Sequence, residues 1–166
     1  IFNWTYSDEQ RAKAAWNPAK GDNPYAELPQ MVLMTYQMPK EIREVALNTD
    51  TNEFDLNEFF STNNGKFKYD SSVDKFLDAM TLQEKFPFST PELRDELKHT
   101  FWLLDRVDSA KALAKKLHEH PVFKDYEIIL AAGDGRMDDE EETKKSYDKV
   151  VDAISKYDKT ITLSVG

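Results

Sequence analysis

The sequence predicts an α/β fold: a mainly parallel sheet flanked by helices, with a helical insertion. Two short apolar runs, Phe101–Leu104 and Glu127–Ala131, are typical of strands that are buried on both faces. Between them, Ala110, Leu113 and Leu117 recur at helical spacing and predict one apolar helix face. Because the two strands are joined through a helix, we expect them to lie parallel, with a right-handed crossover.

Two further strands are expected in the same sheet. Met31–Tyr36 is an apolar run, and Pro39 after it suits the first turn of a helix. Thr160–Ser164 is the last apolar run, and a long amphipathic helix that begins at Asp138 or Asp139 is predicted before it. The acidic residues at the start of that helix suit the positive end of the helix dipole.

Capping residues predict where other helices begin. Ser7 is expected to cap a short helix over residues 8–16, and Ser71 or Ser72 to cap a helix in the polar middle of the chain. Pro91 is expected in the first turn of the helix that follows, since proline is favoured there.

Composition divides the chain into parts. Residues 1–30 are rich in aromatic side chains and broken by proline and glycine, so we expect a connector that packs on a neighbouring domain. Residues 48–98 are polar with helical periodicity and predict a helical insertion between two strands of the sheet. The sheet itself is assigned to residues 31–47 and 99–166. Because the chain stops at Gly166 inside an apolar alternation, we expect a piece of a larger enzyme.

Charge and composition narrow the class of protein. The chain has 22 Lys and Arg against 31 Asp and Glu, a net charge of −9, which argues against a free-standing nucleic-acid binder but not against one lobe of a nucleic-acid motor. There is no cysteine, so disulfides and thiolate metal sites are excluded and the cytoplasm is the expected location. No apolar run approaches the roughly 18 residues of a membrane span, and no membrane partner is expected.

Several motifs for nucleotide and metal chemistry are absent. Gly133-Asp134-Gly135 is not continued as G-x-G-x-x-G, and neither a phosphate loop G-x-x-x-x-G-K-[ST] nor a nucleophile elbow G-x-S-x-G occurs. The chain by itself is therefore not expected to hydrolyse a nucleotide, and no catalytic residue is assigned. His118 and His120 are two apart near a helix end and point in different directions, so no metal site is expected.

The candidate site lies at the carboxyl ends of the predicted strands, where function sits in folds of this class. The loops Arg106–Ser109 and Gly133–Arg136 are expected at the same edge of the sheet, because parallel strands end together. Asp108 and Ser109 are expected to cap the helix that follows. A helix amino terminus, glycine amides and two guanidiniums suit contact with phosphate. A plain tight turn accounts equally well for Gly133-Asp134-Gly135.

The order of these elements resembles the second RecA-like lobe of superfamily 2 helicases. The segments ALAKKL, FKDYEIILAAG and KTITLSVG look most like the helicase portion of R subunits of type I restriction enzymes. In that resemblance the strand ending near Arg106 and the helix at Ser109 correspond to the motif IV region. The strand ending at Gly133-Asp134 corresponds to a segment that closes with a small loop contacting nucleic acid. TITLSVG is similar to the strand leading into motif V.

The resemblance implies a lobe of an ATP-dependent DNA translocase. Its implied partners are double-stranded DNA, a first RecA-like lobe, and the methylation and specificity subunits of a restriction complex. ATP and Mg²⁺ are expected for the larger enzyme, but no cofactor is expected in this chain, which lacks the Walker motifs, motifs III and VI and the nuclease carboxylates. The convergence of the two loops at one edge, taken together with this resemblance, predicts DNA-backbone contacts for five residues: Arg106, Ser109, Gly133, Asp134 and Arg136.

Two other hypotheses remain open at this point. The first is a non-catalytic α/β module that binds a nucleotide or a partner protein through its aromatic amino-terminal segment. The second is a small complete enzyme of flavodoxin-like type, which the missing phosphate loop makes less favourable.

Overall fold

The structure, a computed structural model, describes residues 3–28, 33–131 and 140–166. The chain forms two compact units, Ile1–Tyr36 and Gln37–Gly166, and each is described here by itself. The first unit contains helix α1 (Tyr6–Ala14) and the 3-10 turn η1 (Pro18–Lys20). The helices of the second unit are α2 (Lys40–Arg43), α3 (Leu56–Phe59), α4 (Asp70–Leu82), α5 (Pro91–Glu96), α6 (Val107–Glu119), the 3-10 turn η2 (Phe123–Asp125) and α7 (Glu140–Lys156). Its strands are β1 (Thr62–Asn63), β2 (Lys66–Phe67), β3 (His99–Leu104), β4 (Glu127–Ala131) and β5 (Thr160–Val165).

The main sheet has three parallel strands in the order β3-β5-β4. Strand β5, the last in the sequence, lies in the centre and pairs with both neighbours. Thr160 aligns with His99 on one side and with Glu127 on the other. The predicted parallel α/β sheet is therefore confirmed for these three segments.

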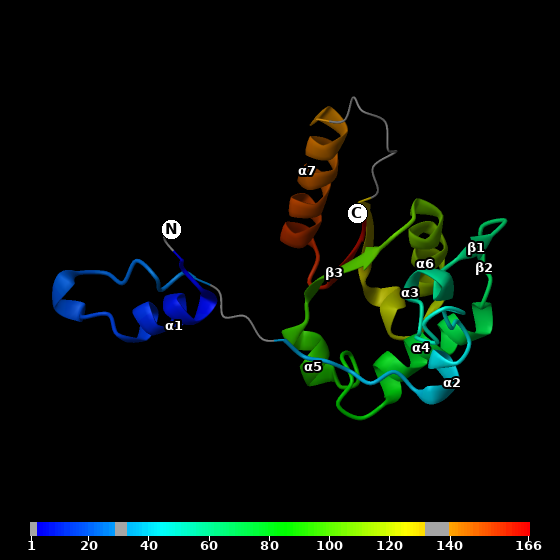
Figure 1. The fold of residues 1–166 in the computed structure, drawn as a ribbon. Helices are drawn as coiled ribbons and strands as arrows, with labels where there is room; N and C mark the ends of the chain where they lie inside the picture. The colour runs from blue at the N-terminus through cyan, green and yellow to red at the C-terminus, as the bar shows by residue number, and fades with distance from the viewer. Residues whose placement is uncertain (1–2, 29–32, 132–139) are drawn as a thin grey trace. The chain divides into compact units, whose positions relative to one another are not determined.

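Helices α6 and α7 lie on opposite faces of this sheet (Figure 1). On β4, Ile128 packs against the core cluster that contains Leu113 of α6, whereas Ile129 packs with Val150 and Ala153 of α7. Successive side chains of a strand point to opposite faces, so both faces of β4 are covered by apolar groups. This two-sided burial explains why its sequence is a continuous apolar run.

The predicted helical insertion, residues 48–98, contains the helices α3, α4 and α5, but fewer than half of its residues are helical. It also contains the β1–β2 hairpin, which was not predicted. Asn64 and Gly65 form the turn with φ values of 51° and 75°. Positive φ at both central residues is the requirement of the type I′ hairpin turn, which Asn-Gly satisfies best. Phe59, Phe67 and Leu77 of this region share one buried cluster with helix α6, so the insertion and the sheet have a common core.

The strand predicted at Met31–Tyr36 is wrong for the part that the structure describes. Residues 33–36 belong to no strand, and Leu33 is 87% exposed; residues 31 and 32 lie outside the described residues. A strand forms when its backbone groups pair with a neighbouring strand, and an apolar run alone does not supply that partner.

Two predicted helix starts also need correction. Helix α1 is capped by Thr5 rather than Ser7, because Thr5 and Asp8 form a capping box in which each side chain accepts the other residue's backbone N–H. Helix α4 begins at Asp70, which places Ser71 and Ser72 inside its first turn, with Tyr69 at the N-cap position. The predicted start at Pro91 is confirmed, with the Thr90 side chain as its cap. The start predicted at Asp138 or Asp139 lies outside the described residues.

The aromatic residues of the first unit pack on one another. Trp4 stacks on Tyr25 with 6.4 Å between ring centroids, and Trp16 meets Tyr25 edge-on at 6.1 Å. The Trp16 indole donates a 3.0 Å hydrogen bond to the carbonyl of Gly21. This unit therefore has a small aromatic cluster of its own.

Among the described helices, none combines the length and the apolar character that a bilayer crossing requires.

The core of the second unit gives a matched pair of stability variants. Leu117 of α6 is fully buried, whereas Leu82 at the end of α4 is 77% exposed. We expect Leu117→Ala to lower the free energy of unfolding by about 2–5 kcal/mol, since it removes buried methyl groups and leaves a cavity. Leu82→Ala should change it by less than about 0.5 kcal/mol. Urea unfolding followed by circular dichroism measures both, and equal effects would contradict the described core.

Candidate functional site

The carboxyl ends of all three parallel strands lie at one edge of the sheet. The pairing aligns Leu104 of β3 with Val165 of β5, and Ala131 of β4 with Ser164. Gly166 then donates a 3.4 Å backbone hydrogen bond to the carbonyl of Leu104. We call this the carboxyl edge. The expectation that β3 and β4 end at a common edge is confirmed, whereas Gly133, Asp134 and Arg136 lie outside the described residues.

Arg106 follows β3 at the carboxyl edge and is open to solvent. Its backbone occupies the N-cap position of α6 in an extended conformation, and its side chain makes no capping hydrogen bond. The guanidinium Nε lies 3.2 Å from a carboxylate oxygen of Asp105, and the Arg106 side chain is 64% exposed. An exposed ion pair of this kind contributes little to stability, so the guanidinium is available to another anion.

Ser109 has a different role from the predicted one. Helix α6 begins at Val107, earlier than predicted, with Arg106 at its N-cap position. Neither Asp108 nor Ser109 is therefore its cap. Ser109 is fully buried, and its hydroxyl donates a 2.6 Å hydrogen bond to the carbonyl of Phe60 at the end of α3. The hydroxyl thus joins the first turn of α6 to the insertion. Of the predicted site residues that the structure describes, Arg106 has an exposed side chain and Ser109 does not.

The insertion contributes polar groups near Arg106 that the sequence analysis missed. The Glu58 carboxylate accepts a 2.9 Å hydrogen bond from the Tyr69 hydroxyl and forms an ion pair with the Lys68 ammonium. Lys68 also lies 5.2 Å from the centre of the Tyr69 ring. The hydrogen bonds from Lys68 and Tyr69 hold the pKa of Glu58 below its ordinary value, and the positive charge of Arg106 adds to this effect. We call Glu58, Lys68 and Tyr69 the Glu58 cluster.

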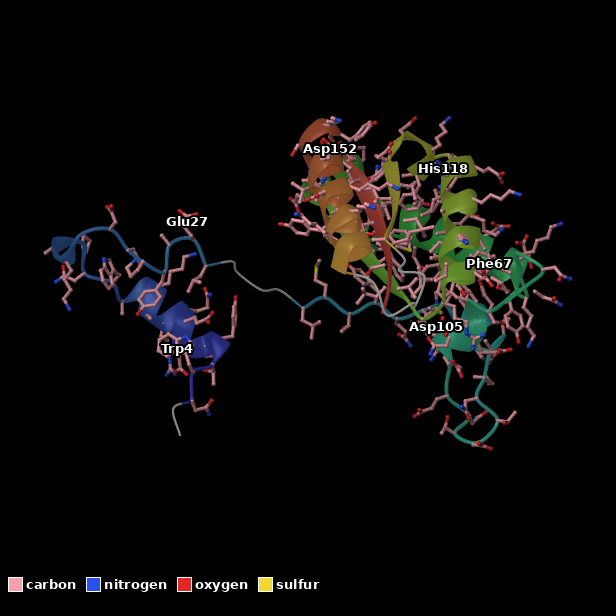
Figure 2. All side chains as sticks on the ribbon, turned by 90° about the horizontal axis from the view of Figure 1, so that it is seen from above. Trp4, Glu27, Phe67, Asp105, His118 and Asp152 are labelled. Atoms are coloured by element: carbon pink, nitrogen blue, oxygen red, sulfur yellow. The ribbon has the colours of Figure 1, made fainter. Side chains whose placement is uncertain are left out.

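The Glu58 cluster and the Asp105–Arg106 pair together place two cations beside two carboxylates. The negative charge of Asp105, which would by itself repel a phosphate, is paired with the Arg106 guanidinium. A phosphate near this edge would compete with Asp105 for the exposed Arg106 guanidinium, in an ion pair that contributes little to stability. Figure 2 shows Asp105 near one end of α6, His118 towards the other end, and Phe67 of the hairpin beside the helix.

No metal centre is evident in the part of the chain that the structure describes: no group of three or more His, Asp or Glu side chains gathers there in positions to hold an ion. His118 is exposed on α6. His120 instead lies with its Nε2 atom 3.3 Å from a carboxylate oxygen of Asp78 on α4.

In comparisons with known proteins, no family model, no curated protein and no solved structure matches this chain.

The buried Ser109 hydroxyl gives a direct test of the link between α6 and the insertion. We expect Ser109→Ala to lower the free energy of unfolding by about 1–3 kcal/mol, because the carbonyl of Phe60 loses its buried donor. Ser71→Ala, at an exposed position in the first turn of α4, serves as the matched control and should be nearly neutral. Urea unfolding measures both variants; a neutral Ser109→Ala would show that this hydrogen bond does not hold the two parts together.

Proposed function

We propose that this chain forms part of the second RecA-like lobe of an ATP-dependent DNA translocase, of the kind found in R subunits of type I restriction enzymes. The observation that carries the proposal is the parallel sheet whose strands end together at the carboxyl edge, next to the exposed Arg106 and the start of α6. The resemblance of the segments ALAKKL, FKDYEIILAAG and KTITLSVG supports it.

In this proposal the carboxyl edge contacts the DNA backbone and reads no bases. Arg106 offers a planar guanidinium that matches a phosphate in two-pronged geometry, and Lys68, which is ion-paired with Glu58, offers a point charge. Contacts of this type position a protein on DNA without regard to sequence, which suits a motor that moves over any sequence. The proposal also assigns contacts with the DNA backbone to Gly133, Asp134 and Arg136, which lie outside the described residues.

The remaining parts of the motor are assigned to other segments and subunits. A first RecA-like lobe would bind ATP and Mg²⁺, whose hydrolysis chemistry supplies the free energy for stepping. Methylation and specificity subunits would complete the restriction complex and recognise the target sequence. Within this chain, the role of α6 is to hold Arg106 at the carboxyl edge through its buried inner face and the Ser109 hydrogen bond.

A second candidate function, a module that binds a partner protein, is favoured by the exposed side of β3. Phe101 and Leu103 are 60% and 77% exposed, on a strand that pairs with β5 alone within the described sheet. Neighbouring apolar side chains exposed on an edge strand are typical of surfaces that meet another protein. In a translocase the same surface would face another part of the motor.

The translocase proposal predicts a sequence-independent role for Arg106. In the full-length native protein, we expect Arg106→Ala to weaken binding to two duplexes of unrelated sequence by the same factor. The slope of log affinity against log salt should fall by roughly one unit, because one phosphate contact is lost. Fluorescence anisotropy of labelled duplexes over a salt series measures both quantities.

Arg43→Ala is the matched control, since Arg43 is an exposed arginine on α2, outside the carboxyl edge. It should bind both duplexes like the parent protein. If Arg106→Ala binds both duplexes like the unsubstituted protein at moderate salt, Arg106 does not contact DNA. Absence of duplex binding by the parent protein would contradict the translocase proposal and favour the protein-binding module.

A further inference from the structure

A pocket of about 480 Å³ lies at the opposite edge of the sheet, where β4 and β5 begin. Tyr126 and Lys159, which immediately precede these strands, line it together with Arg94 from α5. Its volume falls within the range of small-molecule sites. The carboxyl edge is at the other end of the strands, so this pocket is separate from the proposed DNA surface.

The Tyr126 hydroxyl is the first sign that the pocket is built for a ligand. Tyr126 is only 6% exposed, and its ring packs edge-on against Phe88 and Phe123. Its hydroxyl oxygen is buried and has no hydrogen-bond partner among the described residues. Buried polar groups are nearly always paired in native proteins, so an unpaired hydroxyl on a residue that lines a pocket points to a ligand that pairs with it once the side chains covering the oxygen move aside.

The charged groups of the pocket show what kind of ligand would fit. Arg94 is half-buried and donates to the carbonyl of Phe88 at 2.6 Å, but it has no carboxylate partner in the described part of the chain. Asp125, which carries the opposite charge and also lines the pocket, is exposed and likewise has no ion-pair partner among the described residues. Lys159 and Asp158, which also line the pocket, are already paired, Lys159 with Asp95 at 2.9 Å and Asp158 with Lys98 at 3.0 Å.

One unpaired cation and one unpaired carboxylate around an aromatic wall suit a molecule that carries both charges. We propose that this pocket binds a small zwitterion with an apolar body, such as an α-amino acid with an apolar side chain. The ligand carboxylate would lie against Arg94 and the Tyr126 hydroxyl, its ammonium against Asp125, and its apolar body against Tyr157. A phosphate dianion is disfavoured, because Asp125 and Asp158 both face the pocket.

The protonation state of Tyr126 fits this role. Burial raises the pKa of its hydroxyl above the ordinary value of 10.0, although the nearby charges of Lys159 and Arg94 act in the opposite direction. The hydroxyl therefore stays protonated at neutral pH and is able to donate to a carboxylate.

The probes are L-leucine, L-methionine and L-phenylalanine, titrated into the ¹⁵N-labelled chain and followed by amide NMR shifts. We expect at least one of them to produce saturable shifts at residues 94, 125, 126 and 159. Two partial probes, 3-phenylpropionate and 2-phenylethylamine, each lack one charge and should bind at least about tenfold more weakly than the amino acid, the equivalent of one lost charged contact. Inorganic phosphate should cause no saturable shift at these residues.

Tyr126→Phe removes the hydroxyl and keeps the ring. We expect the free variant to melt at the same temperature as the parent or higher, since an unpaired buried hydroxyl is lost, while probe affinity falls by about tenfold. Tyr147→Phe, at an exposed tyrosine on α7, is the matched control and should change neither quantity. Asp125→Asn should weaken the amino acid but not 3-phenylpropionate.

Three results would overturn the proposal. The first is the absence of saturable shifts from all three amino acids up to roughly 10 mM, the limit of weak specific binding. The second is parent-like binding by Tyr126→Phe. The third is 3-phenylpropionate binding as tightly as L-phenylalanine, which would leave a carboxylate site without an ammonium subsite.

Discussion

The parallel pairing of β5 with both β3 and β4 is the constraint on which the rest of the second unit depends. In the described sheet β3 and β4 do not pair with each other, so β5 alone joins them. Its residues Thr160 to Leu163 are buried, which means that the strand is covered on both faces by the helices. Because all three strands run in one direction, the sheet has two chemically different edges. Arg106 lies at the carboxyl edge, and the pocket of Tyr126 and Lys159 lies where the strands begin.

Helix α6 connects this sheet to the insertion. Its apolar side packs on β4 and β5, and its cluster also contains Phe59, Phe67 and Leu77 from residues 48–98. The Ser109 hydrogen bond fixes the first turn of the same helix to Phe60. The insertion is thereby held close to the carboxyl edge, which explains why the Glu58 cluster lies within electrostatic reach of Arg106. A helix that looks like a simple crossover in the sequence thus also determines which polar groups surround the candidate site.

Sequence patterns predict the local elements of this fold well and its long-range contacts poorly. Strands β4 and β5 and helix α6 follow from apolar runs and helical spacing, because burial on both faces leaves a direct mark on composition. The expectation that Phe101–Leu104 is buried on both faces is wrong, since Phe101 and Leu103 on one face of β3 are exposed. The β1–β2 hairpin was missed although Asn64-Gly65 is a strong turn signal. Met31–Tyr36 was assigned to a strand because an apolar run carries no information about a pairing partner. The Glu58 cluster and the Tyr126 pocket depend on contacts between residues far apart in the chain, for which a single sequence has no pattern.

The direction of β5 between its neighbours can be measured directly in this cysteine-free chain. Lys98 precedes β3, and its carbonyl accepts a 2.8 Å hydrogen bond from the Thr160 amide at the start of β5. A nitroxide attached to Lys98→Cys should broaden the NMR signals of the amides of Thr160 and Glu127 strongly and that of Val165 far less. The reason is that a strand rises about 3.3 Å per residue, so the two ends of β5 lie at very different distances from the label. Stronger broadening at Val165 than at Thr160 would show that β5 runs antiparallel to β3 and would contradict the arrangement of both edges.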